Sequence, residues 1–184
     1  MDRRHFLALL PSAVLAPLAA AHALESFPSI HPMSSPDVQG ASGPDPVTKL
    51  KKPHKEWKGV LSEAQYDVLF EESTERPGSS PLNAEKRAGT FICAACFLPL
   101  FDASTKFESG TGWPSFTAPL PGHVETKRDF KIILPRTEYH CIRCGGHQGH
   151  VFNDGPKPAG KRYCNNGVAL RFIPRGESLP ALRS

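Results

Sequence analysis

The stretch "CIRCGGHQGHVFNDGP", residues 141–156, opens on two cysteines with two residues between them. An earlier stretch, "CAAC" at residues 93–96, has the same spacing. Thiolates spaced in this way can chelate one metal ion from a tight turn, and two such turns supply the four soft ligands that tetrahedral zinc prefers. Since 44 residues lie between the turns, only the folding of the whole domain can bring them together. We therefore expect one structural zinc ion, held by Cys93, Cys96, Cys141 and Cys144.

Two other uses of these cysteines stay open at this point. An exported protein can pair its cysteines in disulfides, and a Cys-x-x-Cys turn can be a redox dithiol. A disulfide framework usually links distant segments, however, and two redox dithiols in one small domain would be redundant. The metal site is the favoured interpretation, and Gly145 after the second turn helps the backbone to close there.

Around the two turns the sequence is typical of an antiparallel, mainly β domain. The signal consists of short β-branched or aromatic segments bounded by Gly, Pro, Asp or Asn. Such segments occur at residues 89–93, 99–101, 123–127, 130–134, 138–141 and 168–173. In the last of them Val168, Leu170 and Phe172 alternate with other residues, as in a half-buried strand.

One helix is expected before the strands, over residues 61–74. Ser62 and Gln65 make a capping-box pattern at its start. The expected domain runs over residues 56–175 and is followed by a C-terminal tail, 176–184. Before the domain, residues 24–55 form a Pro/Ser-rich arm that cannot bury enough apolar surface to order itself.

Residues 1–23 have the layout of an export signal, with a basic start, a short apolar run and a small-residue end. The pair Arg3-Arg4 resembles the twin-arginine signal of bacteria. A membrane anchor that stays attached is the alternative, but Pro11 and Pro17 interrupt the short apolar run. We expect a periplasmic protein that contacts membranes only through this signal.

Composition narrows the possible partners of the chain. The 184 residues are 39% hydrophobic and carry a net charge of +4, with Lys and Arg scattered along the sequence. A nucleic-acid-binding protein usually gathers its basic residues into a patch or stripe. No nucleic-acid partner is therefore expected.

The fifth cysteine, Cys164, stands apart from the two turns. An isolated cysteine is often only a small buried hydrophobe. On a strand, however, Arg162 and Asn166 would share its face, where the first could stabilise a thiolate and the second could donate a hydrogen bond. His147 and His150 follow the second turn and are suited to moving protons, although either could instead be a zinc ligand. Four cysteines already fill a tetrahedral site, which makes the ligand role less favourable.

An aromatic side chain completes this group of candidates. Trp113 lies on a Gly/Pro turn in "SGTGWPSF". A tryptophan in such a loop is often part of the core, but it can also form the wall of a site for a small apolar group.

Three stretches, "TKFESGTGWPSF", "CIRCGGHQGHVFNDGP" and "RYCNNGVALRF", closely resemble the methionine-R-sulfoxide reductases of the B type, over about residues 61–172. The resemblance implies two antiparallel sheets in a tent-like arrangement, with one zinc ion at one end. It also implies reduction of the R epimer of methionine sulfoxide, free or in oxidised proteins, which repairs oxidative damage.

The resemblance also implies roles for the candidate residues. Cys164 attacks the sulfoxide sulfur and becomes a sulfenic acid, while Arg162 favours its thiolate. Trp113 holds the substrate methyl group. The remaining candidates organise water or donate protons to the departing oxygen: His147, His150 and Asn166.

The chain departs from the family pattern at one position that matters for recycling. Many members carry a second cysteine in the Gly-x-Gly-Trp turn, where this chain has Thr111. Gly167 also replaces a more usual serine, which affects only local packing. Without a resolving cysteine, Cys164 should need an external reductant, either a thioredoxin-like protein or a small thiol.

Two rival functions remain. A zinc-ribbon binding module would keep the metal but consume no sulfoxide. A thiol-disulfide oxidoreductase that uses one Cys-x-x-Cys turn would lose its function when zinc binds.

Overall fold

The structure is a computed structural model that describes residues 47–130 and 135–184. The expected export signal and most of the Pro/Ser-rich arm lie outside the described residues, as does nearly all of the strand expected at 130–134. Among the described residues, no helix has both the length and the apolar character that a membrane crossing requires.

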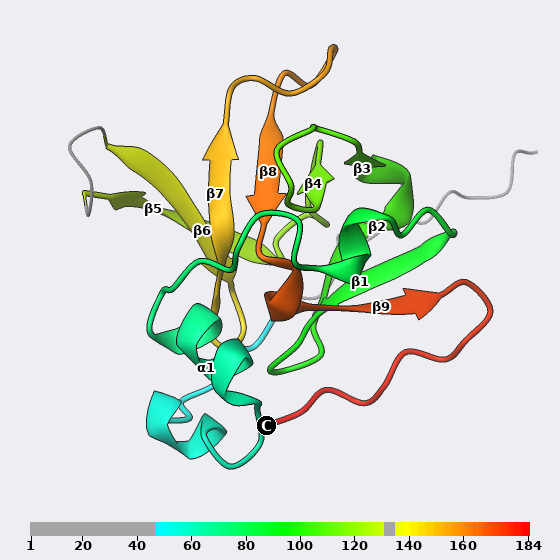
Figure 1. Ribbon diagram of the computed structural model, residues 1–184. Coiled ribbons are helices and arrows are strands. Elements are labelled where there is room, and N and C mark those ends of the chain that lie inside the picture. Colours follow the sequence, from blue (N-terminus) through cyan, green and yellow to red (C-terminus); the bar gives the residue numbers. More distant parts are fainter. Residues whose placement is uncertain (1–46, 131–134) are drawn as a thin grey trace, which may run out of the picture. The chain divides into compact units, whose positions relative to one another are not determined.

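The strands of residues 47–130 and 135–184 form two antiparallel sheets (Figure 1). The smaller sheet has the order β2-β1-β9, and the larger has the order β3-β4-β8-β7-β6-β5. The bounds are β1 Gly89–Cys93, β2 Pro99–Asp102, β3 Lys106–Phe107, β4 Ser115–Phe116, β5 Val124–Asp129, β6 Arg136–Cys141, β7 His147–Phe152, β8 Arg162–Asn165 and β9 Leu170–Pro174. The expected mainly β fold with two antiparallel sheets is confirmed.

Helix α1 spans Glu63–Phe70 and has the expected capping box. The Ser62 hydroxyl accepts from the Gln65 N–H at 3.2 Å, and the Gln65 side chain accepts from the Ser62 N–H at 3.1 Å. The helix ends four residues earlier than predicted. Glu72, at φ 54°, has already turned the chain into the left-handed region, which α-helices do not contain.

The core packs aromatic side chains from both sheets. Phe91, Phe101, Phe116 and Tyr139 have no exposed surface. The Phe101 and Phe116 rings stack with centroids 4.1 Å apart, and Phe91 meets Phe116 edge-on at 5.0 Å. Because the smaller sheet supplies Phe91 and Phe101 and the larger supplies Phe116 and Tyr139, these contacts hold the sheets together.

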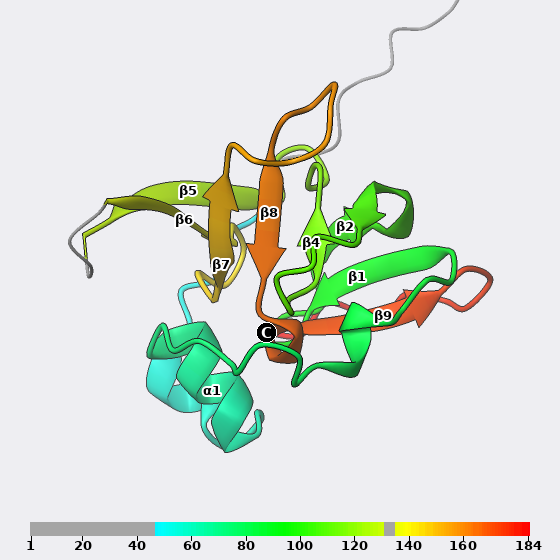
Figure 2. The same ribbon diagram turned by 45° about the horizontal axis from the view of Figure 1, so that its top comes forward.

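Short 3₁₀ turns join several elements: η1 His54–Trp57, η2 Pro81–Asn83, η3 Ala103–Thr105 and η4 Gly167–Ala169. Turn η4 corrects the expected strand at 168–173, because β9 begins only at Leu170 and Val168 belongs to the turn. Figures 1 and 2 show η4 between β8 and β9, beside α1. This turn therefore links the two sheets at the side that α1 covers.

Candidate active site and metal centre

Four buried cysteines meet between the two sheets. Their Sγ atoms all lie within 4.8 Å of one another, with Cys93 and Cys144 separated by 3.7 Å and Cys96 and Cys141 by 3.5 Å. A disulfide requires about 2.05 Å. Thiolates on a tetrahedral zinc with Zn–S of about 2.3 Å lie about 3.8 Å apart. The cluster thus fits a tetrahedral metal ion and holds no disulfide.

The two cysteine turns are built alike. In the first, the Phe97 N–H donates to the Cys93 carbonyl at 3.0 Å, and in the second the Gly145 N–H donates to the Cys141 carbonyl at 2.9 Å. The donor in each turn has a positive φ, 62° for Phe97 and 73° for Gly145. Since a positive φ is unfavourable for phenylalanine, the first turn depends more on its surroundings than the second. The guanidinium groups of Arg171 and Arg183 lie 4.8 and 3.9 Å from the Phe97 ring centroid and cover this turn.

The cysteine cluster connects the sheets. Cys93 ends β1 in the smaller sheet, whereas Cys141 ends β6 in the larger one. Among the described residues, the candidate metal cluster consists of the four cysteines and includes neither His147 nor His150. A bound ion would therefore cross-link two separate layers of the domain.

Cys164 lies elsewhere, on β8, and is partly exposed. Its cross-strand neighbours are His150 on β7 and Ser115 on β4. Gly149 permits the close approach of β7, because a Cβ there would lie 1.9 Å from the Cys164 carbonyl oxygen. The thiol faces a cavity of about 120 Å³, lined by Thr74, Trp113, Arg136, Gly149, His150, Phe152, Cys164, Asn165 and Asn166.

Burial raises the pKa of the Cys164 thiol above its ordinary value. The Arg162 charge and hydrogen bonds from Thr111, Arg162 and Ser115 act in the opposite direction, but burial prevails. Arg162 was expected to favour the thiolate, and its charge does lower the pKa. The same guanidinium also pairs with Asp154, whose carboxylate accepts two hydrogen bonds from Arg162 at 2.9 and 2.8 Å.

Three linked hydroxyls lie near Cys164, two from the turn before β4 and one from Ser115 on β4 itself. The Ser109 hydroxyl lies 2.8 Å from those of both Thr111 and Ser115. The Thr111 and Ser115 hydroxyls lie close enough to Cys164 to lower the pKa of its thiol. At Thr111 the site therefore offers a hydroxyl group rather than a second thiol.

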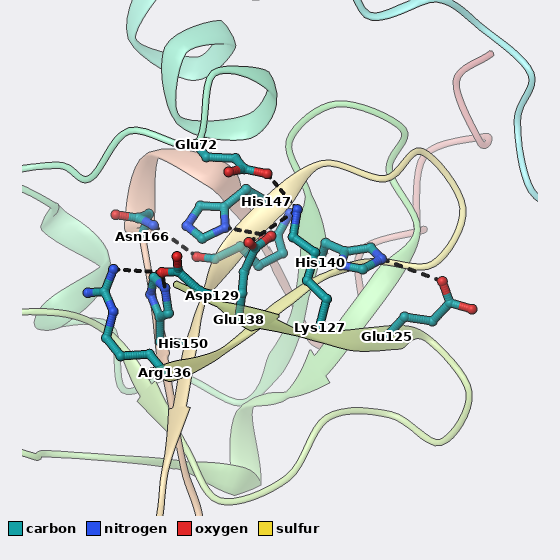
Figure 3. Close-up of polar contacts among 11 residues, drawn as sticks. Glu72, Glu125, Lys127, Asp129, Arg136, Glu138, His140, His147, His150 and Asn166 are labelled. Atoms are coloured by element: carbon teal, nitrogen blue, oxygen red, sulfur yellow. Dashed lines mark hydrogen bonds and ion pairs between the residues drawn. The ribbon is translucent and has the colours of Figure 1, made fainter. Parts of the chain in front are cut away.

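His150 is held by a carboxylate behind it (Figure 3). Its Nε2–H donates to Asp129 Oδ2 at 2.8 Å, and Arg136 donates to the same oxygen at 2.7 Å. Burial lowers the pKa of His150, although Asp129 opposes this effect. With Nε2 occupied by Asp129, Nδ1 is the ring nitrogen available to the cavity.

His147 lies behind His150 rather than among the residues that line the cavity. It is only 2% exposed, and the two ring centroids are 5.4 Å apart. Its Nδ1 lies 3.0 Å from Glu138 Oε1, and Glu138 is also 3.3 Å from Lys127 (Figure 3). Burial acts to raise the pKa of Glu138, but the contact with His147 lowers it overall.

Asn166 is not on the strand that carries Cys164, because β8 ends at Asn165. It caps η4 and borders the cavity. Its side-chain oxygen accepts from the Glu75 N–H and its amide donates to the Gln148 carbonyl, both at 3.1 Å. Backbone groups therefore fix its orientation.

Trp113 is positioned by the same segment that holds Asn166. Its Nε1–H donates to the Glu75 carbonyl at 3.2 Å, while the Glu75 carboxylate accepts from the N–H groups of Gly167 and Val168 at 2.6 and 2.9 Å. The Trp113 ring lines the cavity. One loop residue, Glu75, thus organises two walls of the site.

Sequence reasoning missed several residues that build this site: Thr74, Glu75, Ser109, Ser115, Asp129 and Arg136. Ser109 and Ser115 could have been found, because both lie in the stretch "SGTGWPSF" around Trp113. Asp129 and Glu75 gave no local signal, since their partners are distant in the chain.

Comparisons with known proteins found a matching family model and several curated relatives. The family model described as "SelR domain" matches residues 61–174. A relative from Pseudomonas putida (strain W619), named peptide methionine sulfoxide reductase MsrB, is 51% identical over 131 residues, which cover 70% of this chain and 98% of the relative. Proteins of the same name from Bradyrhizobium diazoefficiens and Methanosarcina barkeri are 46% and 51% identical, over 76% and 67% of this chain and 99% and 87% of their own lengths.

Proposed function

Since this chain belongs to the SelR domain family of peptide methionine sulfoxide reductases, we propose that Cys164 is the nucleophile that reduces the R epimer of methionine sulfoxide. The observation that carries the proposal is the contrast among the thiols. Four of the five cysteines are committed to one buried cluster, and the fifth faces a cavity beside a histidine.

The reaction balances without an external proton. Cys164 Sγ attacks the sulfoxide sulfur and forms an S–S bond to it, and the protonated oxygen then moves to Sγ as the S–O and S–S bonds break, which leaves free methionine and a sulfenic acid on Cys164. Methionine sulfur gains two electrons and Cys164 loses two. A sulfoxide oxygen leaves only when it is protonated, so a proton must reach it during the attack.

The proton comes from Cys164 itself in this proposal. Its raised pKa and the lowered pKa of His150 favour a neutral thiol beside a neutral imidazole. Because the two residues are cross-strand neighbours, Nδ1 of His150 can take the thiol proton and pass it to the oxygen, directly or through water. Asp129 stabilises the imidazolium that forms between these steps.

The other residues position the substrate and the charges. Trp113 forms an apolar wall for the substrate methyl group, and Asn166 also borders the cavity, where its amide can organise water or a proton donor. His147 supports His150 and Glu138 from behind, and Arg162 moderates the pKa of Cys164.

Recycling requires an external thiol. With Thr111 at the usual resolving position, the sulfenic acid has no free thiol beside it in its own chain. A thioredoxin-like protein or a small thiol would attack Sγ, release water and form a mixed disulfide, which a second donor thiol then resolves.

We also propose that Cys93, Cys96, Cys141 and Cys144 hold one zinc ion, since their spacing fits its tetrahedral coordination. The ion would supply folding energy rather than chemistry at the sulfoxide. Residues 1–23 are proposed to direct twin-arginine export to the periplasm, residues 24–55 to act as an arm, and residues 56–175 to form the reductase domain before the tail 176–184. Fractionation of cells that express the full chain tests the localisation.

The decisive experiment assays purified protein against separated R and S epimers, with dithiothreitol as reductant. The R epimer should be consumed and Cys164 should react with a sulfenic-acid probe after one turnover. Preference for the S epimer would contradict the assignment. Zinc binding with no consumption of either epimer would support the binding-module alternative.

A further inference from the structure

The C-terminal tail, residues 176–184, returns to the four-cysteine cluster after the last strand. Cys93 at the end of β1 pairs with Leu170 at the start of β9, so the chain leaves β9 at the opposite end of the smaller sheet. The tail then runs back (Figure 1), and the Arg183 N–H donates to the Cys96 carbonyl at 3.0 Å. Because the family model matches residues 61–174, this contact comes from a segment outside the matched domain.

Arg183 contacts both cysteine turns through its backbone. Its N–H donates to Cys96 in the first turn, and its carbonyl accepts from the Arg143 guanidinium in the second turn. Each turn supplies two cysteines of the cluster. One residue of the tail therefore connects the two halves of the cluster, and it does so through protein hydrogen bonds rather than through the metal ion.

The Arg183 side chain covers the first turn. Its guanidinium lies 3.9 Å from the Phe97 ring centroid, and both cysteines of this turn have no exposed surface. The charge of Arg183 also interacts with the thiols of Cys93 and Cys96. Four thiolates around one divalent cation leave a net negative charge, so a guanidinium beside them stabilises the loaded site.

A buried ion can leave only when its ligands become accessible through local opening of the chain. The first turn is the weaker of the two, because Phe97 has a φ of 62°, which is unfavourable for phenylalanine. Opening this turn away from the second breaks the Arg183 hydrogen bonds and uncovers the Phe97 ring. The tail contacts therefore oppose the motion that releases the ion.

We propose that the C-terminal tail controls how fast the metal centre loses its ion, because Arg183 holds the two cysteine turns together and covers the first of them. This inference rests on the proposed zinc site. The tail adds a kinetic barrier to metal loss that the four cysteine ligands alone do not provide.

The test measures how fast zinc leaves natively prepared, zinc-loaded protein into an excess of a chromogenic pyridylazo chelator. Truncation after Pro180 removes residues 181–184 and both backbone contacts of Arg183. It should raise the release rate at least about tenfold. Arg183→Ala loses only the guanidinium and should raise the rate about three- to fivefold. Arg175→Ala is the matched control, since Arg175 is exposed and acts on Asp102, and should stay within about 1.5-fold of wild type.

Local opening is separated from general loss of stability by a second rate. Tryptophan fluorescence after dilution into urea, extrapolated to water, gives the rate of global unfolding of each zinc-loaded protein. Zinc should leave the truncated protein faster than that protein unfolds. Arg183→Ala carries the same test if the truncated chain does not fold. Release at the wild-type rate, or no faster than global unfolding, would overturn the inference, whereas wild-type protein without zinc would instead refute the proposed metal site.

Discussion

The two ends of this domain use the same residue in opposite ways. At the metal centre the cysteines have exposed fractions of 0 to 7%, and their turns join one sheet to the other. At the proposed catalytic end, Cys164 is held within a single sheet, between β7 and β4, and faces a cavity. The reactivity of a cysteine therefore depends on its neighbours and its access to solvent, whereas its contribution to stability depends on the layers that it connects.

The largest effect should come from Cys164→Ser. Turnover of the R-sulfoxide should fall by at least about 10³-fold, because a hydroxyl is a far weaker nucleophile than a thiolate. Zinc content and melting temperature should stay at the wild-type values, since Cys164 lies outside the four-thiol cluster. Metal analysis and calorimetry on the assayed sample test this separation. Turnover near the wild-type value in Cys164→Ser would show that Cys164 is not the nucleophile.

The converse change, Cys96→Ser, should damage the fold. Structural zinc contributes about 10–16 kcal/mol in zinc-finger peptides, and each kcal/mol shifts Tm by about 2–4 °C in chains of this size. The melting temperature should therefore fall by more than about 10 °C, with loss of bound metal. Thermal unfolding with and without a chelator provides the measurement. A variant that keeps its stability after losing the metal would contradict a cross-linking role.

The carboxylate behind His150 offers a smaller and more local test. Asp129→Asn removes the charge that stabilises the His150 imidazolium and should lower kcat by about 10²-fold, with little change in KM. Glu125→Gln is the matched control, because Glu125 lies 3.4 Å from His140, and neither residue lines the cavity (Figure 3). Equal losses in the two variants would assign Asp129 a purely structural role.

The pH dependence of Cys164 should differ from that of an exposed thiol. Burial raises the pKa of Cys164. The thiolate fraction, and with it the rate of alkylation by iodoacetamide, should therefore still increase when the pH exceeds about 8.5, the ordinary pKa of cysteine. Mass spectrometry of peptides alkylated between pH 6 and pH 10 measures this at Cys164 alone. An apparent pKa below 8 would show that Arg162 outweighs burial.

The sequence predicted the metal end better than the catalytic end. The meeting of the four cysteines, the capping box at Ser62 and strand β1 are confirmed, because each depends on residue spacing or a local signal. Strands β7 and β8 were not recognised as separate strands, since glycine, histidine and asparagine have low β-propensity and pairing across the sheet overrides it. Asp129 could not be assigned to His150, because two strand pairings bring them together.

The smallest change in rate is expected for substitutions of Thr111. These substitutions also test whether the four-cysteine cluster takes part in the reaction at Cys164. Thr111→Val removes a hydrogen bond to Cys164 worth about 0.5–1.5 kcal/mol, which should reduce the thiolate population about 2- to 10-fold at a given pH. Thr111→Cys introduces a thiol near Cys164 and should allow an internal disulfide, because the Thr111 hydroxyl lies close enough to lower the pKa of the Cys164 thiol. After one turnover without reductant, wild-type protein should lose one free thiol and Thr111→Cys should lose two, with zinc retained in both. If wild-type protein instead loses two thiols and releases zinc, a metal-centre cysteine has reduced the sulfenic acid. The four clustered cysteines and Cys164 would then take part in one redox cycle, and the cluster would not be purely structural.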